Sequence, residues 1–248
     1  MDHLAWQAKI GLVVVSGSTV CEGRYPRVAP REVGFFTSRM LLRGGGVAAL
    51  EAMEGNAARA IEELASVPVD AIAYCCTVSG ALRGVVGDRT FCQDMAHRWG
   101  IPVTSTMLAA TEALRHLNLR RVVVTSPYPD SHHEAERVYL AQCGIEAMAM
   151  RGMGLAKAQA YANVTPEEIL RFSLHAWDDA ADGLFISCMN FDAMPAVQAL
   201  EAHLGKPVVT SHSATLWRAL ALAGIDIPIG GYGRLLAQES RCAVAEAR

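Results

Sequence analysis

Two segments of the chain, VDAIAYCC at Val69–Cys76 and ADGLFISC at Ala181–Cys188, share one pattern, and this pattern decides the fold. Each contains an aspartate, then a short apolar run, and ends on a cysteine. The separation is 112 residues both for the aspartates (70 to 182) and for the final cysteines (76 to 188). A short apolar run bounded by polar residues is typical of a buried strand. The two segments therefore predict equivalent strands in two similar halves.

Two further pairs of segments extend this repeat. PVTST at Pro102–Thr106 recurs as PVVTS at Pro207–Ser211, 105 residues later, and GLVVVS at Gly11–Ser16 parallels RVVVTS at Arg121–Ser126, 110 residues later. The period is far longer than that of a solenoid repeat, so it indicates duplication of a whole α/β unit. We therefore expect two halves related by a pseudo-two-fold axis.

Short apolar runs alternate with helical patterns along the whole chain, as in βα units stacked around a parallel sheet. The predicted strands are Ile10–Val15, Gly34–Thr37, Ala71–Cys75, Val103–Ser105, Val122–Thr125, Ala147–Met150, Leu184–Ser187 and Val208–Thr210. The predicted helices are Val47–Ala65, Asp88–Trp99, Met107–Leu117, Asp130–Cys143, Thr165–Ala180, Pro195–Leu204 and Ser213–Ala223. The fold class is α/β, with two similar Rossmann-like parallel-sheet halves and an active site in the cleft between them. Residues 1–106, completed by 213–248, are expected to form the N-terminal half, and residues 107–212 the C-terminal half.

The composition excludes several classes of function. The chain has 248 residues, 52% of them hydrophobic, and a formal net charge of −3. Neither lysine nor arginine forms a run, which argues against nucleic-acid or membrane partners. No apolar stretch reaches the roughly 18–20 residues that a membrane span needs, and the first residues lack the pattern of a signal peptide. We expect a cytoplasmic protein, and a homodimer is a reasonable expectation for this fold.

Seven cysteines are present, an odd number without a C-x-x-C pair, which makes a disulfide framework improbable. Most are expected to be small buried side chains, and Cys75 faces the core by strand alternation. Cys76 and Cys188 are different, because each follows the last residue of an equivalent strand. Ligands of parallel sheets bind at the carboxyl ends of the strands. The two thiols are therefore predicted to converge on one symmetric site.

Two opposed thiols suit a reaction in which opposite faces of a carbon are attacked. A thiol near the N–H groups of a following helix can have its pKa lowered, and such a thiolate acts as a base or nucleophile. The opposite thiol, still protonated, acts as an acid. Racemisation beside a carboxylate fits this arrangement. Thiolate addition to a conjugated diacid, followed by rotation and elimination, fits equally well.

Hydroxyl and amide side chains at the predicted strand ends are candidates for binding a small carboxylate substrate. The binding residues predicted here are Ser16, Ser18, Thr19, Thr77, Tyr128, Asn190 and Ser211. Weaker candidates are Ser79, Asn163, His212 and Arg39, whereas His132 and His133 are expected to be solvated. No histidine spacing typical of a helical zinc site occurs. We expect neither a metal nor an organic cofactor.

The segments AYCCT at Ala73–Thr77 and FISC at Phe185–Cys188 resemble the aspartate/glutamate racemase superfamily. Within it, the chain is most similar to the branch of maleate cis-trans isomerases and arylmalonate decarboxylases. Supporting segments are TSRM at Thr37–Met40, SPYPD at Ser126–Asp130 and LGKPVV at Leu204–Val209. The resemblance covers nearly the whole chain. It implies a two-half α/β fold, no cofactor and small dicarboxylate-type substrates.

The resemblance also implies roles for individual residues. Cys76 matches the nucleophile of the isomerases, Cys188 the acid on the other side, and Tyr128 a tyrosine that binds a substrate carboxylate. The decarboxylases have glycine at the position of Cys76, so the presence of both thiols favours isomerisation or racemisation. Ser18 stands where the isomerases typically have asparagine. Val78 and His212 also differ from the residues that are usual in the isomerases. These three differences put maleate itself in doubt as the substrate.

Four functions follow from this pattern. The leading hypothesis is cis-trans isomerisation of maleate or a related unsaturated diacid through an adduct on Cys76. The alternatives are a two-thiol racemase of an amino acid or related compound, and an arylmalonate-type decarboxylase with Cys188 as proton donor. A non-enzymatic protein that binds small acids is a further class.

Overall fold

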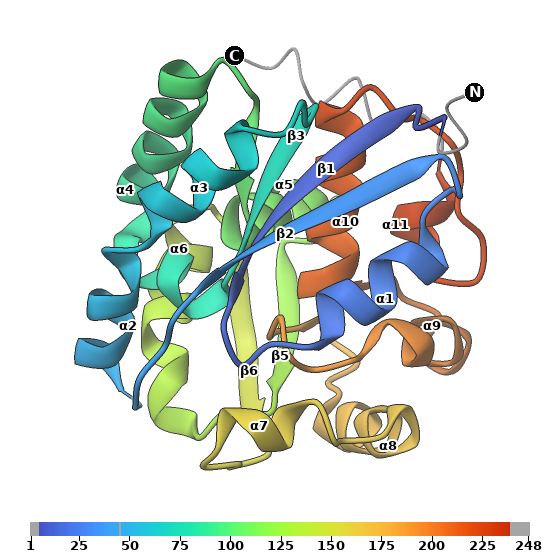
Figure 1. The fold of residues 1–248 in the computed structure, drawn as a ribbon. Coiled ribbons are helices and arrows are strands. Elements are labelled where there is room, and N and C mark those ends of the chain that lie inside the picture. Colours follow the sequence, from blue (N-terminus) through green and yellow to red (C-terminus); the bar gives the residue numbers. More distant parts are fainter. Residues whose placement is uncertain (1–4, 45, 239–248) are drawn as a thin grey trace.

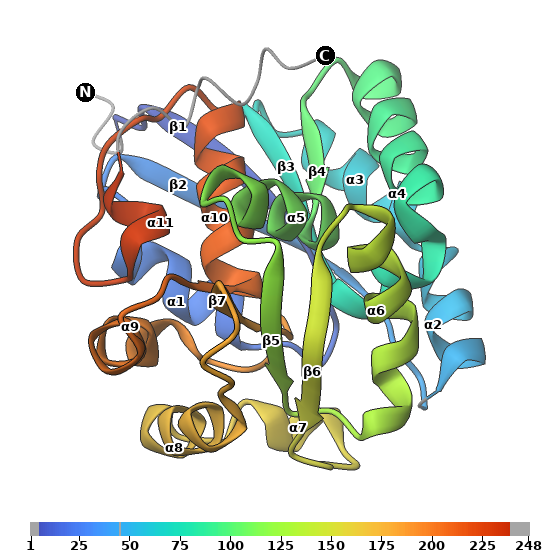
Figure 2. The same cartoon turned by 180° about the vertical axis from the view of Figure 1, so that it is seen from behind.

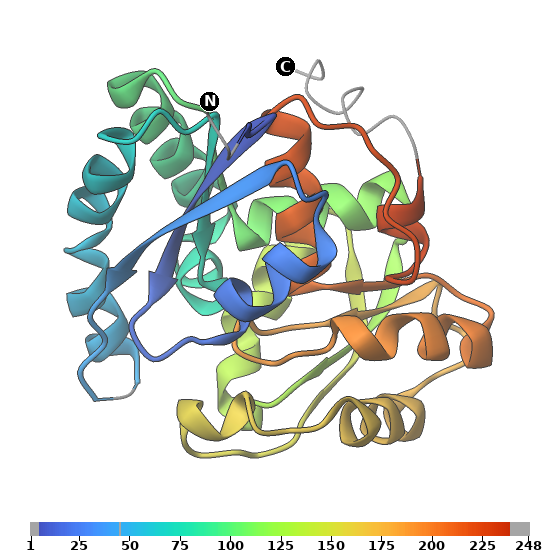
Figure 3. The same ribbon diagram turned by 45° about the vertical axis from the view of Figure 1, so that its right-hand side comes forward.

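Each half of the chain contributes one four-stranded, wholly parallel sheet. The computed structural model describes residues 5–44 and 46–238, so Cys242 and the end of the predicted 213–248 segment lie outside the described residues. The first sheet has the order β2-β1-β3-β4 and the second the order β6-β5-β7-β8. The strands are β1 (Ala8–Val15), β2 (Val33–Met40), β3 (Ala71–Cys75), β4 (Val103–Ser105), β5 (Arg121–Ser126), β6 (Glu146–Gly152), β7 (Gly183–Ile186) and β8 (Val208–Thr210). The predicted two-half α/β fold is confirmed, and Figure 3 shows the sheets as separate blocks.

The aspartate that opens each repeat anchors the first strand of its half. Lys9 N donates to Asp70 Oδ2 at 2.7 Å, and Arg121 N donates to Asp182 Oδ2 at 2.9 Å. Lys9 and Arg121 are 112 residues apart in the sequence, and so are Asp70 and Asp182, so β1 recurs as β5 at an offset of 112. The offset of 110 predicted for this strand is wrong, because a run of valines aligns equally well in neighbouring registers.

Helices cover both faces of each sheet. Their bounds are α1 (Val20–Val28), α2 (Val47–Glu54), α3 (Ala57–Ala65), α4 (Thr77–Trp99), α5 (Thr106–His116), η1 (Asp130–His132), α6 (His133–Gln142), α7 (Ala158–Tyr161), α8 (Pro166–Ala176), η2 (Met194–Ala196), α9 (Val197–Leu204), α10 (Ser211–Leu222) and α11 (Arg234–Ala237). In Figure 1, α3 and α4 lie on one side of the first sheet and α1 and α10 on the other. None of the helices in the described part of the chain is both long and apolar enough to cross a membrane.

The two halves share one core, which is formed around the packed pair α5 and α10 (Figure 2). Each of these helices begins directly after the fourth strand of its half. Ser105 Oγ accepts from Leu108 N at 3.1 Å, and Thr210 Oγ1 accepts from Ser213 N at 2.9 Å, so both helices are capped in the same way. The fully buried Trp217 of α10 belongs to this shared core.

Three predictions about the helices were wrong. The single helix expected over Val47–Ala65 is two helices, α2 and α3, separated at Gly55 and Asn56. The helix predicted over Asp88–Trp99 begins earlier, at Thr77 directly after Cys76, as α4, which bends at Gly84 with φ of 68°. Helix α1 was not predicted, because Pro26 lies inside it and proline disfavours helices.

Replacement of Gly183 by alanine tests the close packing of β7. An added methyl would lie 2.7 Å from the carbonyl oxygen of Pro207 and 2.7 Å from Leu119 Cδ1, so backbone and side chain must move. The equivalent position of the first half is Ala71, which is fully buried. We expect Gly183→Ala to lower the free energy of unfolding in urea by about 1–3 kcal/mol. Gly87→Ala, on the exposed side of α4, serves as the control. It should raise the free energy of unfolding by up to about 1 kcal/mol.

Candidate active site

The two predicted thiols lie at equivalent points of the two halves. Cys76 follows β3 and is the N-cap residue of α4, and Cys188 follows β7. Both are largely buried, with 7% and 5% of their surface exposed. They are close enough that a charge on Cys76 raises the pKa of Cys188. The hydroxyl of Ser211 contacts both the N–H of Cys188 and the side chain of Thr77, so the two thiol-bearing loops lie beside each other at the carboxyl ends of β3 and β7.

The backbone of Cys188 has an unusual conformation. Its φ is 122°, a region that side chains other than glycine rarely adopt. Two hydrogen bonds hold it: Cys188 N donates to Ser211 Oγ at 3.0 Å, and Asn190 N donates to Cys188 Sγ at 3.3 Å. Strained residues held by their surroundings cluster at functional sites. The geometry fixes the direction of this thiol.

Ser211 connects the loops that carry the two thiols. In addition to its bond with Cys188, its hydroxyl lies 3.2 Å from Thr77 Oγ1. Thr77 directly follows Cys76, and both hydroxyl-bearing residues are buried. This contact ties the end of β3 to the end of β7. Thr77 and Ser211 thus lie where the sequence predicted them, although part of their hydrogen-bonding capacity is used within the protein.

Cys76 has polar neighbours on its own helix. Its Sγ donates to Ser79 Oγ at 3.1 Å. Burial raises the pKa of Cys76, while hydrogen bonds with Ser79 and the positive charge of Arg83 act in the opposite direction. The expected lowering of this pKa is absent here, because loss of solvent outweighs the donors of the first helical turn.

Cys188 is held more firmly in its protonated form. Burial raises its pKa to about 12, and nearby charges on Cys76 and Glu136 raise it further. A hydrogen bond with Tyr128 and the N–H of Asn190 oppose this shift. Tyr128 is itself buried, and burial raises the pKa of its phenol well above the ordinary value. The phenol is therefore a neutral donor facing the thiol.

The loop after β1 meets the loop after Cys188. Ser18 Oγ donates to the carbonyl of Met189 at 3.2 Å, and Thr19 N donates to Asn190 Oδ1 at 3.1 Å. Ser18 and Asn190 are therefore brought together near the site. The side chain of Ser16 instead accepts from Leu42 N at 3.1 Å and supports the loop after β2. The N–H of Thr19 is engaged by Asn190, so the candidate binding groups of this loop are hydrogen-bonded within the protein.

Tyr128 rests on a buried hydroxyl–imidazole pair. Tyr128 N donates to Ser126 Oγ at 3.1 Å, and Ser126 Oγ lies 2.8 Å from His133 Nε2. The prediction that His133 is solvated is wrong, because only 4% of it is exposed. A methyl group on Gly152 would overlap the carbonyl of Tyr128, so glycine is required beside this loop.

The weaker candidates lie mostly outside the site. Arg39 Nη1 donates to the carbonyls of Ser16 and Ser18 at 2.8 and 2.9 Å, so it holds the loop after β1. His212 is buried and lies edge-on to the ring of Tyr25 of α1. Asn163 is exposed. Within the described ranges no three histidine, cysteine or acidic side chains are grouped to hold a metal ion.

Three groups that affect the thiols were missed. Glu54 of α2 and Arg83 of α4 act on Cys76, and Glu136 of α6 acts on Cys188. Glu136 could have been found from its spacing, because His133, Glu136 and Leu140 are three and seven residues apart and share one helix face. Arg83 precedes the predicted helix Asp88–Trp99, so the sequence did not indicate that it lies on the helix that follows Cys76.

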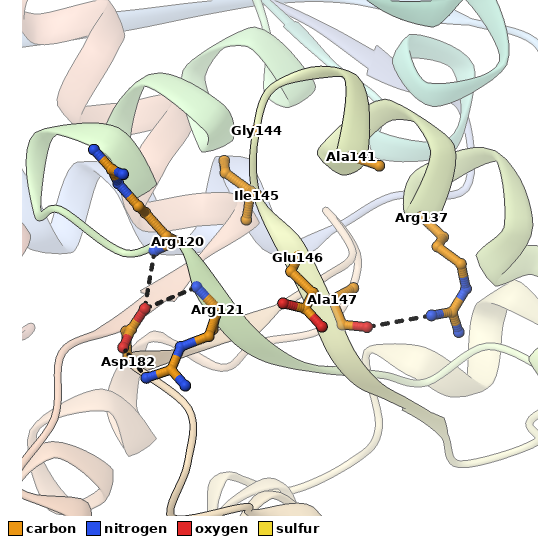
Figure 4. A pocket seen from close by; sticks show the side chains of 9 residues that line it. All are labelled: Arg120, Arg121, Arg137, Ala141, Gly144, Ile145, Glu146, Ala147 and Asp182. Atoms are coloured by element: carbon orange, nitrogen blue, oxygen red, sulfur yellow. Dashed lines mark hydrogen bonds and ion pairs between the residues drawn. The ribbon is translucent and has the colours of Figure 1, made fainter.

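A large surface hollow lies elsewhere. It has a volume of about 840 Å³ and is lined by Arg120, Arg121, Arg137, Ala141, Gly144, Ile145, Glu146, Ala147 and Asp182 (Figure 4). Arg121 and Glu146 begin β5 and β6, so the hollow lies at the amino ends of these strands. The thiols lie at the opposite, carboxyl ends. A smaller hollow of about 200 Å³ includes Thr19 and Asp192 and borders the site.

Comparison with known proteins agrees with this geometry. A maleate isomerase of Pseudomonas putida is 27% identical over 241 residues, covering 92% of this chain and 96% of its own. An arylmalonate decarboxylase of Bordetella bronchiseptica is 31% identical over 156 residues, covering 62% and 65%. A solved structure of a Nocardia farcinica maleate cis-trans isomerase, a cysteine-to-serine mutant with a covalently bound succinylcysteine intermediate, has a TM-score of 0.88 at 25% identity and covers 94% and 99%.

These similarities confirm the resemblance to the branch of isomerases and decarboxylases that the sequence indicated. The match to the family described as arylmalonate decarboxylase runs over residues 11–236, which is nearly the whole described chain. The protein therefore belongs to the arylmalonate decarboxylase family of enzymes.

Proposed function

We propose that this enzyme interconverts the cis and trans isomers of maleate or a related unsaturated diacid. The observation that carries this proposal is the unequal pair of thiols in one site. Burial raises the pKa of both thiols and Glu54 adds to the shift of Cys76, but hydrogen bonds with Ser79 and the charge of Arg83 oppose the shift of Cys76, whereas the pKa of Cys188 reaches about 12. One sulfur is thus suited to attack and the other to donate a proton.

The reaction begins with addition to the double bond. The Cys76 thiolate forms a bond to one olefinic carbon, and the π electron pair moves to the neighbouring carbon. That carbon takes the proton of the Cys188 thiol, which gives a succinyl thioether on Cys76. The related Nocardia isomerase was captured with a covalently bound succinylcysteine, the same chemical species.

The reaction then runs in reverse from a rotated intermediate. Rotation about the new single bond exchanges the positions of the two carboxylates. The Cys188 thiolate removes the proton, the double bond forms again and the bond to Cys76 breaks. Nothing is oxidised or reduced, and both thiols return to their starting states.

We assign the binding of the substrate carboxylates to uncharged hydrogen-bond donors. Tyr128 faces Cys188, and Ser18 and Asn190 join the loops beside it. Hydroxyl and amide groups can exchange their internal hydrogen bonds for bonds to a carboxylate. The shorter Ser18, in place of the asparagine typical of isomerases, leaves room for a diacid other than maleate itself.

Decarboxylation of a substituted malonate is the second candidate. It is favoured by the family match over residues 11–236 and by the 31% identity with the Bordetella enzyme. In that reaction Cys188 alone delivers a proton to the carbon that loses carbon dioxide, and Cys76 has no chemical role.

Single cysteine variants separate these two functions. Cys188→Ala should lower turnover of maleate by about 10²–10⁴-fold, as expected for loss of a general acid, and Cys76→Ala should abolish it. Fumarate is followed by proton NMR, with Cys143→Ala, a buried cysteine outside the site, as the control. Retention of activity on a malonate by Cys76→Ala, without any maleate turnover by the parent enzyme, would select the decarboxylase.

The pH dependence gives an independent check. Because the pKa of Cys76 is raised, its thiolate fraction is small at pH 7 and increases with pH. Cys188 stays protonated until the pH approaches about 12. We therefore expect kcat/KM to rise continuously between pH 7 and 9.5, measured as initial rates of fumarate formation. A decline over this range would contradict the assignment of Cys188 as the acid.

A further inference from the structure

The thiol of Cys188 lies in an irregular loop, residues 187–193, between the end of β7 and the beginning of η2. Its counterpart Cys76 is held differently, because helix α4 begins directly after it. The positive φ of Cys188 is unfavourable and persists only where the surroundings fix the backbone. Contacts from other parts of the chain must therefore do for Cys188 what α4 does for Cys76.

Arg24 of α1 forms an ion pair with Asp192 of this loop. Its Nε donates to Asp192 Oδ1 at 2.9 Å, and its Nη2 donates to Asp192 Oδ2. A guanidinium that engages both oxygens of a carboxylate fixes orientation as well as distance. Only 20% and 23% of the two side chains are exposed, so solvent screens the pair only in part. The pair joins the two halves, and Figure 1 shows α1 beside α9.

This ion pair holds the loop where other contacts change during the proposed reaction. Ser18 and Asn190 are proposed to exchange their internal hydrogen bonds for bonds to a substrate carboxylate. The bonds from Ser18 Oγ to the loop and from Thr19 N to Asn190 Oδ1 are then given up. Arg24 and Asp192 engage each other, so their pair keeps the loop against α1 while these bonds are exchanged.

We propose that the Arg24–Asp192 ion pair is a positioning contact that keeps the Cys188 thiol directed at the substrate throughout the reaction. This rests on the proposed function only in that Cys188 donates the proton, which both candidate reactions require. Asp192 lies four residues after Cys188 in the same loop, and Asn190 N between them donates to Cys188 Sγ at 3.3 Å. Displacement of the loop therefore moves the thiol, although neither charged side chain touches the reacting atoms.

Turnover by paired variants of the full chain tests this role. Arg24→Gln and Asp192→Asn should each lower kcat for maleate by about tenfold to hundredfold, because a small displacement of a catalytic group is costly. The double variant should be no slower than the single variants, since each removes the same contact. Arg24→Lys keeps the charge without the forked geometry, so its kcat should be intermediate. A double variant whose loss is the product of the two single losses would overturn the proposal.

Two comparisons separate positioning from a direct attraction between Arg24 and the substrate. Arg27→Gln removes the same charge from the same helix and the same small hollow, and it should leave kcat unchanged. If Arg24 itself bound a substrate carboxylate, Asp192→Asn would free it and lower KM, whereas Arg24→Gln would raise KM. KM changes of opposite sign, or an equal loss of kcat in Arg27→Gln, would contradict the positioning role.

The reactivity of Cys188 tests the same role without any need for turnover. Methyl methanethiosulfonate, a small uncharged reagent for thiols, is applied at pH 8.5. Initial rates are measured by mass spectrometry of the tryptic peptide 172–218, in which Cys188 is the single cysteine. Arg24→Gln should increase the rate by about tenfold, because a loop that has lost a charge-assisted contact opens more often. An unchanged rate would overturn the proposal.

Cys76 provides the control within the same sample. It lies in the tryptic peptide 60–83, where fragmentation distinguishes it from Cys75. Because α4 holds Cys76, its rate should be the same in Arg24→Gln as in the parent. Equal acceleration of both thiols would mean that the substitution only loosens the fold, and would also overturn the proposal. Absence of maleate turnover by the parent would refute the proposed function alone, since the rates of thiol modification do not depend on it.

Discussion

The hydroxyl of Ser211 is the contact on which the geometry of the site depends. It accepts the N–H of Cys188 at 3.0 Å and lies 3.2 Å from Thr77 Oγ1, so one oxygen links both thiol-bearing loops. Its place is set by the duplication, since Ser211 begins α10 just as Thr106 begins α5, 105 residues earlier. Thr106 Oγ1 donates to the carbonyl of Tyr74 at 3.2 Å. In the first half the equivalent hydroxyl thus stabilises a strand, and in the second half it holds the strained Cys188.

The duplicated backbone is symmetric, but the two sulfurs are not equivalent. After β3 the chain enters α4 directly, which places Cys76 at an N-cap with ordinary dihedral angles. After β7 the chain forms a loop, and Cys188 adopts a φ of 122°. The first sulfur consequently meets donors from a helical turn, whereas the second meets a phenol and a buried carboxyl group. A symmetric scaffold with asymmetric neighbours is what a reaction needs when one thiol must be ionised and the other protonated.

The sequence predicted the positions of the strands well, because each short apolar run is bounded by polar residues. Ala71–Cys75, Val103–Ser105 and Val208–Thr210 agree with the structure residue for residue. The thiol positions followed from strand ends and repeat spacing alone. The first turn of α4 was missed because threonine, valine, serine and glycine are weak helix formers, and tertiary packing overrides that preference. His133 and Glu136 are polar residues, so their burial could be inferred only from their spacing relative to Leu140 on the same face of α6.

Burial of the site constrains how the proposed diacid substrate would be bound. Cys76 and Cys188 are little exposed, and loss of solvent already raises the pKa of both thiols. The cation beside Cys76, Arg83, is engaged by Glu54 and Asp88, and Arg39 is engaged by backbone carbonyls and by Glu22. Carboxylates in this site would therefore rely on neutral hydroxyl, amide and backbone N–H donors. Such donors stabilise negative charge wherever it moves between sulfur and substrate, and in a site closed to water they do so without solvent reorganisation. A fixed cation at one carboxylate would instead favour a single orientation of the intermediate and hinder the rotation on which isomerisation depends.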